Sequence, residues 1–179
     1  MVKAELVRRF SAGARAAGAE VVETRDRESA AGAVVELLRK ERIDSAVVSP
    51  PALDFGGRIR VIRPGIVEEY AAARAGIVRA DYGVAETGTL VHLDADDEEK
   101  LAWTLPPLCV CLLDTGRIVP ELEALTSVFA GHLRGTGKPG PQVSLVTGPS
   151  RTADIECELT IGVQGPSRVV IILFEATDS

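Results

Sequence analysis

Aromatic residues, cysteines and histidines are all scarce in this sequence. Phe, Trp and Tyr make up 4% of it, so a hydrophobic core must be built mainly from Val, Leu, Ile and Ala. The three cysteines lack paired spacing, which excludes a disulfide framework, and they are too few for a self-contained four-cysteine iron-sulfur cluster. The two histidines have no second ligand nearby in the sequence, which argues against a zinc site. We therefore expect no metal, and thiols that stay reduced in the cytoplasm.

Positive charge and long apolar runs are also missing. The net charge of -6 argues against a general nucleic-acid binder, because neutralising phosphates needs a basic surface. No apolar run approaches the roughly 20 residues of a membrane helix, and Lys3 and Glu5 interrupt any signal peptide. GxGxxG and GxxxxGK[ST] are absent, so no nucleotide loop is indicated. We expect a cytoplasmic protein without a cofactor, which binds no nucleic acid and inserts into no membrane.

Apolar spacing predicts strands that alternate with helices over a single domain, residues 1–179. A helix is expected at residues 2–18, and Thr24 or Asp26 is expected to cap a second helix. The alternation with strands near residues 21 and 47 is typical of a parallel, right-handed β-α-β unit. The run Leu108 to Leu113 is strongly apolar, which predicts a central strand buried on both faces.

Two further helices are expected in the second half of the chain. Asp96 followed by Glu99 is typical of a capped helix start, and acidic residues suit the first turn because the helix dipole is positive there. Apolar residues recur at helical spacing from Ile118 to Leu133, with Pro120 near the start and Gly135 after the end. This pattern predicts one long helix.

A first dense polar segment lies at residues 146–166. We expect the strand at 142–147 to break at Gly148, where glycine lets the backbone approach a ligand closely, and a short helix to follow. The polar residues that this helix would carry are Ser150, Arg151, Thr152, Asp154 and Glu156.

Each of these side chains suits an anion site. Ser150 would cap the helix and leave free N–H groups for an anion, while Arg151 would donate to a carboxylate or phosphate. Asp154 and Glu156 are candidate acid-base groups or partners that orient Arg151. The alternative is a well-capped helix without a ligand, which explains each residue but not their crowding.

A second polar segment contains Glu86, Thr87, Gly88 and Thr89 between strand-like stretches. The hydroxyls and amides could bind a ligand, and Glu86 could act as a base. A carboxyl group that follows an apolar Val-Ala step could be partly buried, and burial would raise its pKa. The alternative is a plain hairpin, in which threonines suit the strands and glycine suits the turn.

Three segments together resemble the LUD domain, the lactate-utilisation protein C family. They are ADYGVAETGTL at 80–90, GPSRTADIE at 148–156 and the GVxGP ending at 162–166. Residues 105–119 are also similar, so the likeness covers about residues 30–174. Gln164 stands where family members usually have His in a GxHGP ending. An amide can form hydrogen bonds but cannot titrate, so a proton-transfer role is not expected there.

The resemblance implies an α/β fold, mainly a parallel sheet with flanking helices, similar to ribose-phosphate isomerase, glucosamine-phosphate deaminase and CoA-transferases. It also implies a site in loops at strand ends. This agrees with the general rule that ligands bind outside the carboxyl ends of parallel strands.

Two functions of different class follow from the resemblance. The first is a component of a cytoplasmic system that oxidises L-lactate to pyruvate. This component would hold no redox centre, act with iron-sulfur partner proteins and bind a small anionic metabolite. The second is a stand-alone enzyme that acts on a sugar phosphate, a CoA ester or another small anion, with Glu86 as base or nucleophile and Arg151 as anion clamp. The lack of cysteine ligands and nucleotide motifs favours the first, because electron transfer needs a cofactor.

Overall fold

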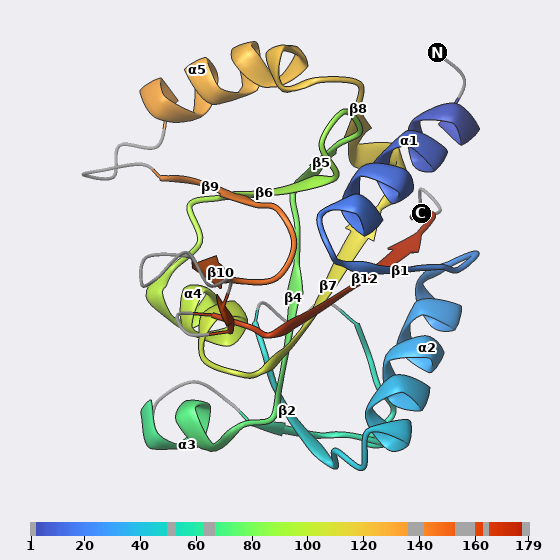
Figure 1. Ribbon diagram of the computed structural model, residues 1–179, viewed down its shortest axis with the longest axis vertical. Helices are drawn as coiled ribbons and strands as arrows, with labels where there is room; N and C mark the ends of the chain where they lie inside the picture. The colour runs from blue at the N-terminus through green and yellow to red at the C-terminus, as the bar shows by residue number, and fades with distance from the viewer. Residues whose placement is uncertain are drawn as a thin grey trace.

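A six-stranded sheet forms the centre of the molecule. The computed structural model describes residues 3–49, 53–62, 67–135, 142–152, 160–162 and 165–176. Every strand of this sheet is parallel to its neighbours. In spatial order the strands are β1 (Glu20–Glu23), β12 (Arg168–Phe174), β7 (Leu108–Asp114), β4 (Ala75–Arg79), β2 (Ser45–Val48) and β3 (Arg60–Ile62). Helices flank the sheet, so the expected α/β class is confirmed (Figure 1).

The apolar strand β7 is central, as predicted. It lies between β12 and β4, and all of its residues except the last are buried. Val110 and Leu112 join one hydrophobic cluster, while Cys109 and Cys111 join the cluster on the opposite face. The strand is therefore covered on both sides, which explains why its sequence is continuously apolar.

Helices cover both faces of the sheet (Figure 1). Their bounds are α1 (Lys3–Ala16), α2 (Arg27–Lys40), α3 (Val67–Ala72), α4 (Asp97–Thr104) and α5 (Thr126–Gly135). Asp26 caps α2 and accepts a hydrogen bond from the Ser29 amide, and Asp96 caps α4, so both predicted caps are confirmed. None of the helices in the described ranges has the length and apolar character to cross a bilayer.

A second sheet lies beside the first and was not predicted. Its order is β8 (Ile118–Val119), β5 (Tyr82–Val84), β6 (Thr89–Leu93) and β9 (Val143–Val146). Val84 and Val91 of this sheet pack with Leu125 and with partly buried residues of α5.

The long helix expected from Ile118 to Leu133 is wrong in its first half. Ile118 and Val119 pair with β5 as a parallel strand, and two short 3-10 helices, Thr115–Arg117 and Leu122–Leu125, flank this strand. The physical reason is that a β-branched pair fits a strand edge, and strand pairing outweighs helical spacing over so few residues.

Candidate functional site

The two polar segments lie together, although 58 positions separate the threonines that link them. Antiparallel pairing of β6 with β9 places Leu90 opposite Val146, so the ends of both strands are adjacent. The hydroxyl of Thr89 is 2.7 Å from the hydroxyl of Thr147 and 2.6 Å from that of Thr87. A chain of three hydroxyl groups therefore joins the hairpin turn to the segment after β9.

The end of α1 contacts both segments through backbone atoms. A Cβ at Gly88 would lie 2.0 Å from the Ala14 nitrogen, and a Cβ at Gly148 would lie 2.3 Å from the Ala17 oxygen. Arg151 donates a hydrogen bond of 2.7 Å from Nη2 to the same Ala17 oxygen. A cation is favoured there because carbonyl groups at the end of a helix carry partial negative charge. At Gly148, where the sequence predicted close approach by a ligand, the backbone of α1 makes that approach instead.

The helix expected from Ser150 is wrong where the structure describes it. Arg151 and Thr152 form β10, which pairs antiparallel with β11 (Thr160–Ile161). The Ser150 amide donates to the Pro166 oxygen at 3.0 Å. This amide is therefore occupied by the neighbouring chain segment, and no helix start holds an anion at Ser150. Asp154 and Glu156 lie outside the described residues.

Glu86 is exposed, so the partial burial suggested by its apolar neighbours is wrong. It lies in the turn between β5 and β6, where the amide of Glu86 donates to the Pro120 oxygen at 3.1 Å. This bond fixes the backbone while the carboxylate faces solvent. The hairpin alternative therefore describes the local structure of this segment, with β5 and β6 as its two strands.

A pocket that the sequence did not indicate lies at the carboxyl ends of β4, β7 and β12. Ligands of parallel sheets bind at this edge. The cavity volume is about 190 Å³, and the lining residues are Arg27, Arg79, Ala80, Asp81, Tyr82, Leu93, Asp114, Arg117 and Phe174. None of the residues proposed from the sequence is among them. Residues 79–82 are consecutive at the end of β4, and the strand order brings the other lining residues to them.

The backbone holds the two aspartates of the pocket in place. Asp81 accepts from the Leu93 amide at 2.7 Å, and Asp114 accepts from the Gly116 amide at 2.9 Å. Arg117 donates to the Tyr82 hydroxyl at 3.3 Å, and its guanidinium lies 5.5 Å from the centre of that ring. In the described ranges, the side chains of Arg27 and Arg79 have no hydrogen-bond or ion-pair partner. The pocket therefore contains two arginines that are available to an anion.

The cysteines of β7 are packing residues in the hydrophobic core. Cys109 and Cys111 are both unpaired and buried. Burial raises the pKa of the Cys109 thiol to about 12 and the pKa of the Cys111 thiol well above its usual value. The thiolate is the form that binds metals, so neither side chain is suited to hold an iron-sulfur cluster.

Sequence comparison identifies the class of protein. Residues 56–174, more than half of the chain, match the model of the LUD domain. The chain therefore belongs to the LUD domain family. Its fold is similar to the crystal structure of a DUF162 family protein from Deinococcus radiodurans, with a TM-score of 0.71 and 21% sequence identity. That likeness covers 97% of this chain and 99% of the other.

Within the family, the chain resembles lactate utilization protein C. It is 34% identical to that protein of Halalkalibacterium halodurans over 112 residues, which cover 62% of this chain and 48% of the relative. It is 29% identical to that of Geobacillus kaustophilus over 101 residues, which cover 56% of this chain and 42% of the relative. The chain thus spans about half the length of the curated relatives that it matches.

Proposed function

We propose that the protein is a lactate utilization protein C-like component of a cytoplasmic system that oxidises L-lactate to pyruvate. In this proposal it acts with iron-sulfur partner proteins and holds no redox centre itself. The observation that carries the proposal is the LUD match over residues 56–174, together with relatives named lactate utilization protein C. The matched region contains the ends of β4, β7 and β12, which together with Arg27 of α2 form the arginine-lined pocket.

The chemistry of the reaction supports a division of labour between proteins. Oxidation of a 2-hydroxy acid to a 2-oxo acid releases two electrons and two protons, and side chains alone do not accept electron pairs. Cys109 and Cys111 lie in the core with raised pKa values, so they are poor cluster ligands. The electrons would therefore pass to an iron-sulfur partner, while this chain would bind the acid or dock the partner.

Reconstitution tests the proposal directly. The chain, its iron-sulfur partner proteins and their mixture would each be assayed for L-lactate-dependent reduction of a dye, and the tagged chain would be tested for copurification with the partners. We expect pyruvate and reduced dye only from the mixture. The proposal is rejected if the partners oxidise lactate equally fast without this chain.

The second candidate function is a stand-alone enzyme that acts on a sugar phosphate or a CoA ester. The observation that favours it is the exposed Glu86 carboxylate beside the hydroxyl chain of Thr87, Thr89 and Thr147. Glu86 would act as base or nucleophile. Turnover of an acyl-CoA or a sugar phosphate by the purified chain, with loss of that turnover in Glu86→Gln, would establish this function and displace the first.

A further inference from the structure

We propose that the arginine-lined pocket binds a small 2-hydroxy or 2-oxo acid, with Arg27 and Arg79 pairing with its carboxylate. Asp81 or Asp114 would accept a hydrogen bond from the hydroxyl group of the acid. The choice of this acid class rests on the proposed function. The anion site itself rests on the geometry of the pocket.

The positions of the two arginines are difficult to explain by stability. Arg27 is the first residue of α2, where the positive end of the helix dipole disfavours a cation. Arg79 is the exposed last residue of β4, whose other four residues are buried. Both side chains line the same cavity, and neither is paired within the described part of the chain. A carboxylate would relieve their repulsion, and the planar guanidinium group matches its two oxygens.

The size of the cavity limits the ligand to a few heavy atoms. Its volume is about 190 Å³, below the roughly 300–1,000 Å³ of pockets for drug-sized ligands. Phe174 and Leu93 provide apolar wall, which suits a short carbon chain. A monocarboxylate with one oxygen on the next carbon fits this volume.

The two aspartates select against a doubly charged anion. In the described contacts, Asp81 accepts from backbone through Oδ2 and Asp114 through Oδ1, so each has a second oxygen that can accept from a ligand hydroxyl. The same carboxylates would repel a phosphate dianion, because like charges close together cost free energy. Arg117 is held against Tyr82 and fixes a third positive charge at the pocket. The lining thus carries three positive and two negative charges, which suits a monoanion.

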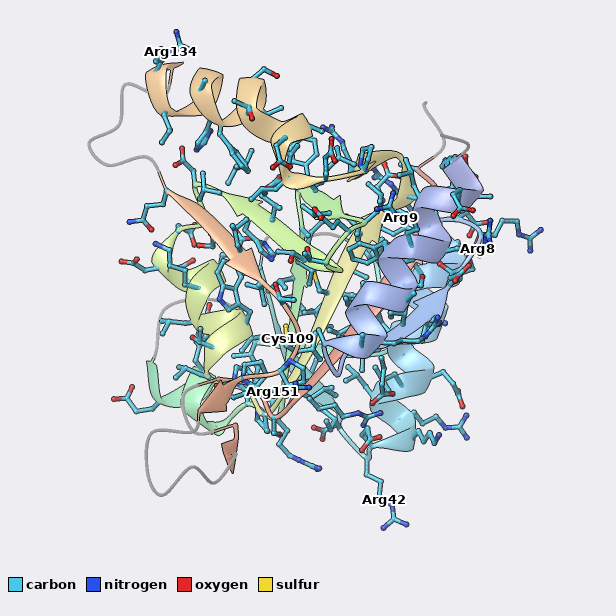
Figure 2. All side chains as sticks on the ribbon, turned by 45° about the horizontal axis from the view of Figure 1, so that its top comes forward. Arg8, Arg9, Arg42, Cys109, Arg134 and Arg151 are labelled. Carbon is cyan, nitrogen blue, oxygen red and sulfur yellow. The ribbon has the colours of Figure 1, made fainter. Side chains whose placement is uncertain are left out.

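Calorimetric titration of the full chain at low salt tests the site without any partner. L-lactate and pyruvate would be compared with acetate, which lacks the second oxygen, and with inorganic phosphate. We expect L-lactate and pyruvate to bind more tightly than either comparison anion. Arg79→Gln and Arg27→Gln should each weaken binding about tenfold or more, because each removes a charge-assisted pair. Arg134→Gln is the matched control, since Arg134 is exposed and extends away from the molecule (Figure 2).

Each outcome of the titration decides one point. Equal affinity of wild type and Arg79→Gln for L-lactate, or no binding of any anion, would overturn the pocket and leave the reconstitution result standing. Tighter, Arg79-dependent binding of phosphate would overturn the acid class. Arg79-dependent binding of L-lactate by a chain that proves dispensable for lactate oxidation would keep the pocket and reject the proposed function. Thermal unfolding of each variant would verify that it is folded.

Discussion

Gly88 shows how closely single residues control the docking of α1. Its φ of +69° is in the left-handed region, and an added Cβ would lie 2.0 Å from the backbone nitrogen of Ala14. Backbone atoms cannot rotate away as a side chain could, so the contact tolerates no substituent. Gly88, which the sequence offered as part of a candidate ligand-binding segment, thus allows α1 to dock closely.

Replacing Gly88 by alanine should therefore destabilise the fold. We expect a loss of roughly 2–4 kcal/mol, from the left-handed backbone together with overpacking against α1. Urea unfolding would measure it. Gly32→Ala is the matched control, because Gly32 lies inside α2 with no atom within 4 Å of an added Cβ. The free energy of unfolding of that variant should equal the wild-type value or exceed it by up to about 1 kcal/mol. Equal midpoints for both variants would contradict the docking contact.

Arg168 links three elements through two carboxylates. Its Nε lies 2.5 Å from Glu20 of β1, and its Nη1 lies 2.7 Å from Glu41 after α2. The hydrogen bond from Arg168 is the main cause that lowers the pKa of Glu20 below its usual value of 4.5. A carboxyl group whose pKa is lowered in the native state stabilises the fold at pH values above its unfolded-state pKa. This contribution is lost as the pH falls through the native pKa.

The variant Glu20→Gln should therefore show a stability difference that depends on pH. At about pH 7 we expect it to be less stable than wild type by up to about 1 kcal/mol, a small effect because the pair is largely exposed. The difference should shrink at acid pH, because a fall in pH through the lowered native pKa protonates the wild-type carboxyl. Urea unfolding at both pH values would measure it. In an Arg168→Gln background the substitution should have little effect at either pH, and an undiminished difference there would exclude the pair as the cause.

Among the elements, α4 depends on a single cap. The Asp96 side chain accepts from the Glu99 amide at 2.8 Å. The helix then carries Trp103, whose ring centroid lies 4.3 Å from that of buried His92, and Glu99, whose Oε1 lies 3.6 Å from His92 Nδ1. A loose first turn would disturb both contacts.

Removing this cap should cost measurable stability. We expect Asp96→Ala to lower the free energy of unfolding by about 1 kcal/mol, the usual effect of losing a side-chain cap. Asp97→Ala is the control, because Asp97 is exposed and forms only a surface ion pair with Lys100, at 3.6 Å. Surface ion pairs contribute little to stability. Thermal or urea unfolding would compare them. If the Asp97 variant lost as much, the cap would not be the cause.

Local signals explain which elements were predictable. The caps at Asp26 and Asp96 and the apolar run of β7 depend on neighbouring residues, and the structure confirms them. The prediction of a helix from Ile118 failed because its helical spacing competes with strand pairing to β5, which is distant in sequence. The prediction of a helix from Ser150 failed for the same reason, because residues 151 and 152 instead form β10 by pairing with β11.

The candidate site was only partly predictable for a related reason. The sequence indicated two polar segments, and the hydrogen bond between Thr89 and Thr147 shows that the two segments are adjacent. It did not indicate the pocket, because Arg27, Arg79 and Arg117 come together only when β4, β7 and β12 are placed in order. No spacing rule within one segment reports which strands are neighbours.

At the scale of the whole molecule, the thiols of β7 report global unfolding. Cys109 and Cys111 are buried in a central strand that is covered on both faces, so we expect global unfolding to be needed to expose them. In a Cys157→Ser variant, we expect these two thiols to react with a disulfide reagent at least about 10³-fold more slowly in buffer than in urea. The rate should follow the unfolding equilibrium. Rapid reaction without denaturant would show that the sheet opens locally.

The pairing of β1 with β12 also has a consequence during synthesis on the ribosome. The Thr24 hydroxyl at the end of β1 bonds to the Leu173 oxygen, 149 positions later in the chain. At translation speeds of about 5–20 residues per second, this interval lasts roughly 7–30 s. During this interval the hairpin that contains Gly83 and Gly88, which contact Phe10 and Ala14, is made, but the hydrophobic cluster around α1 still lacks Ile171 and Leu173 of β12. The core around α1 is therefore completed only after β12 has been synthesised.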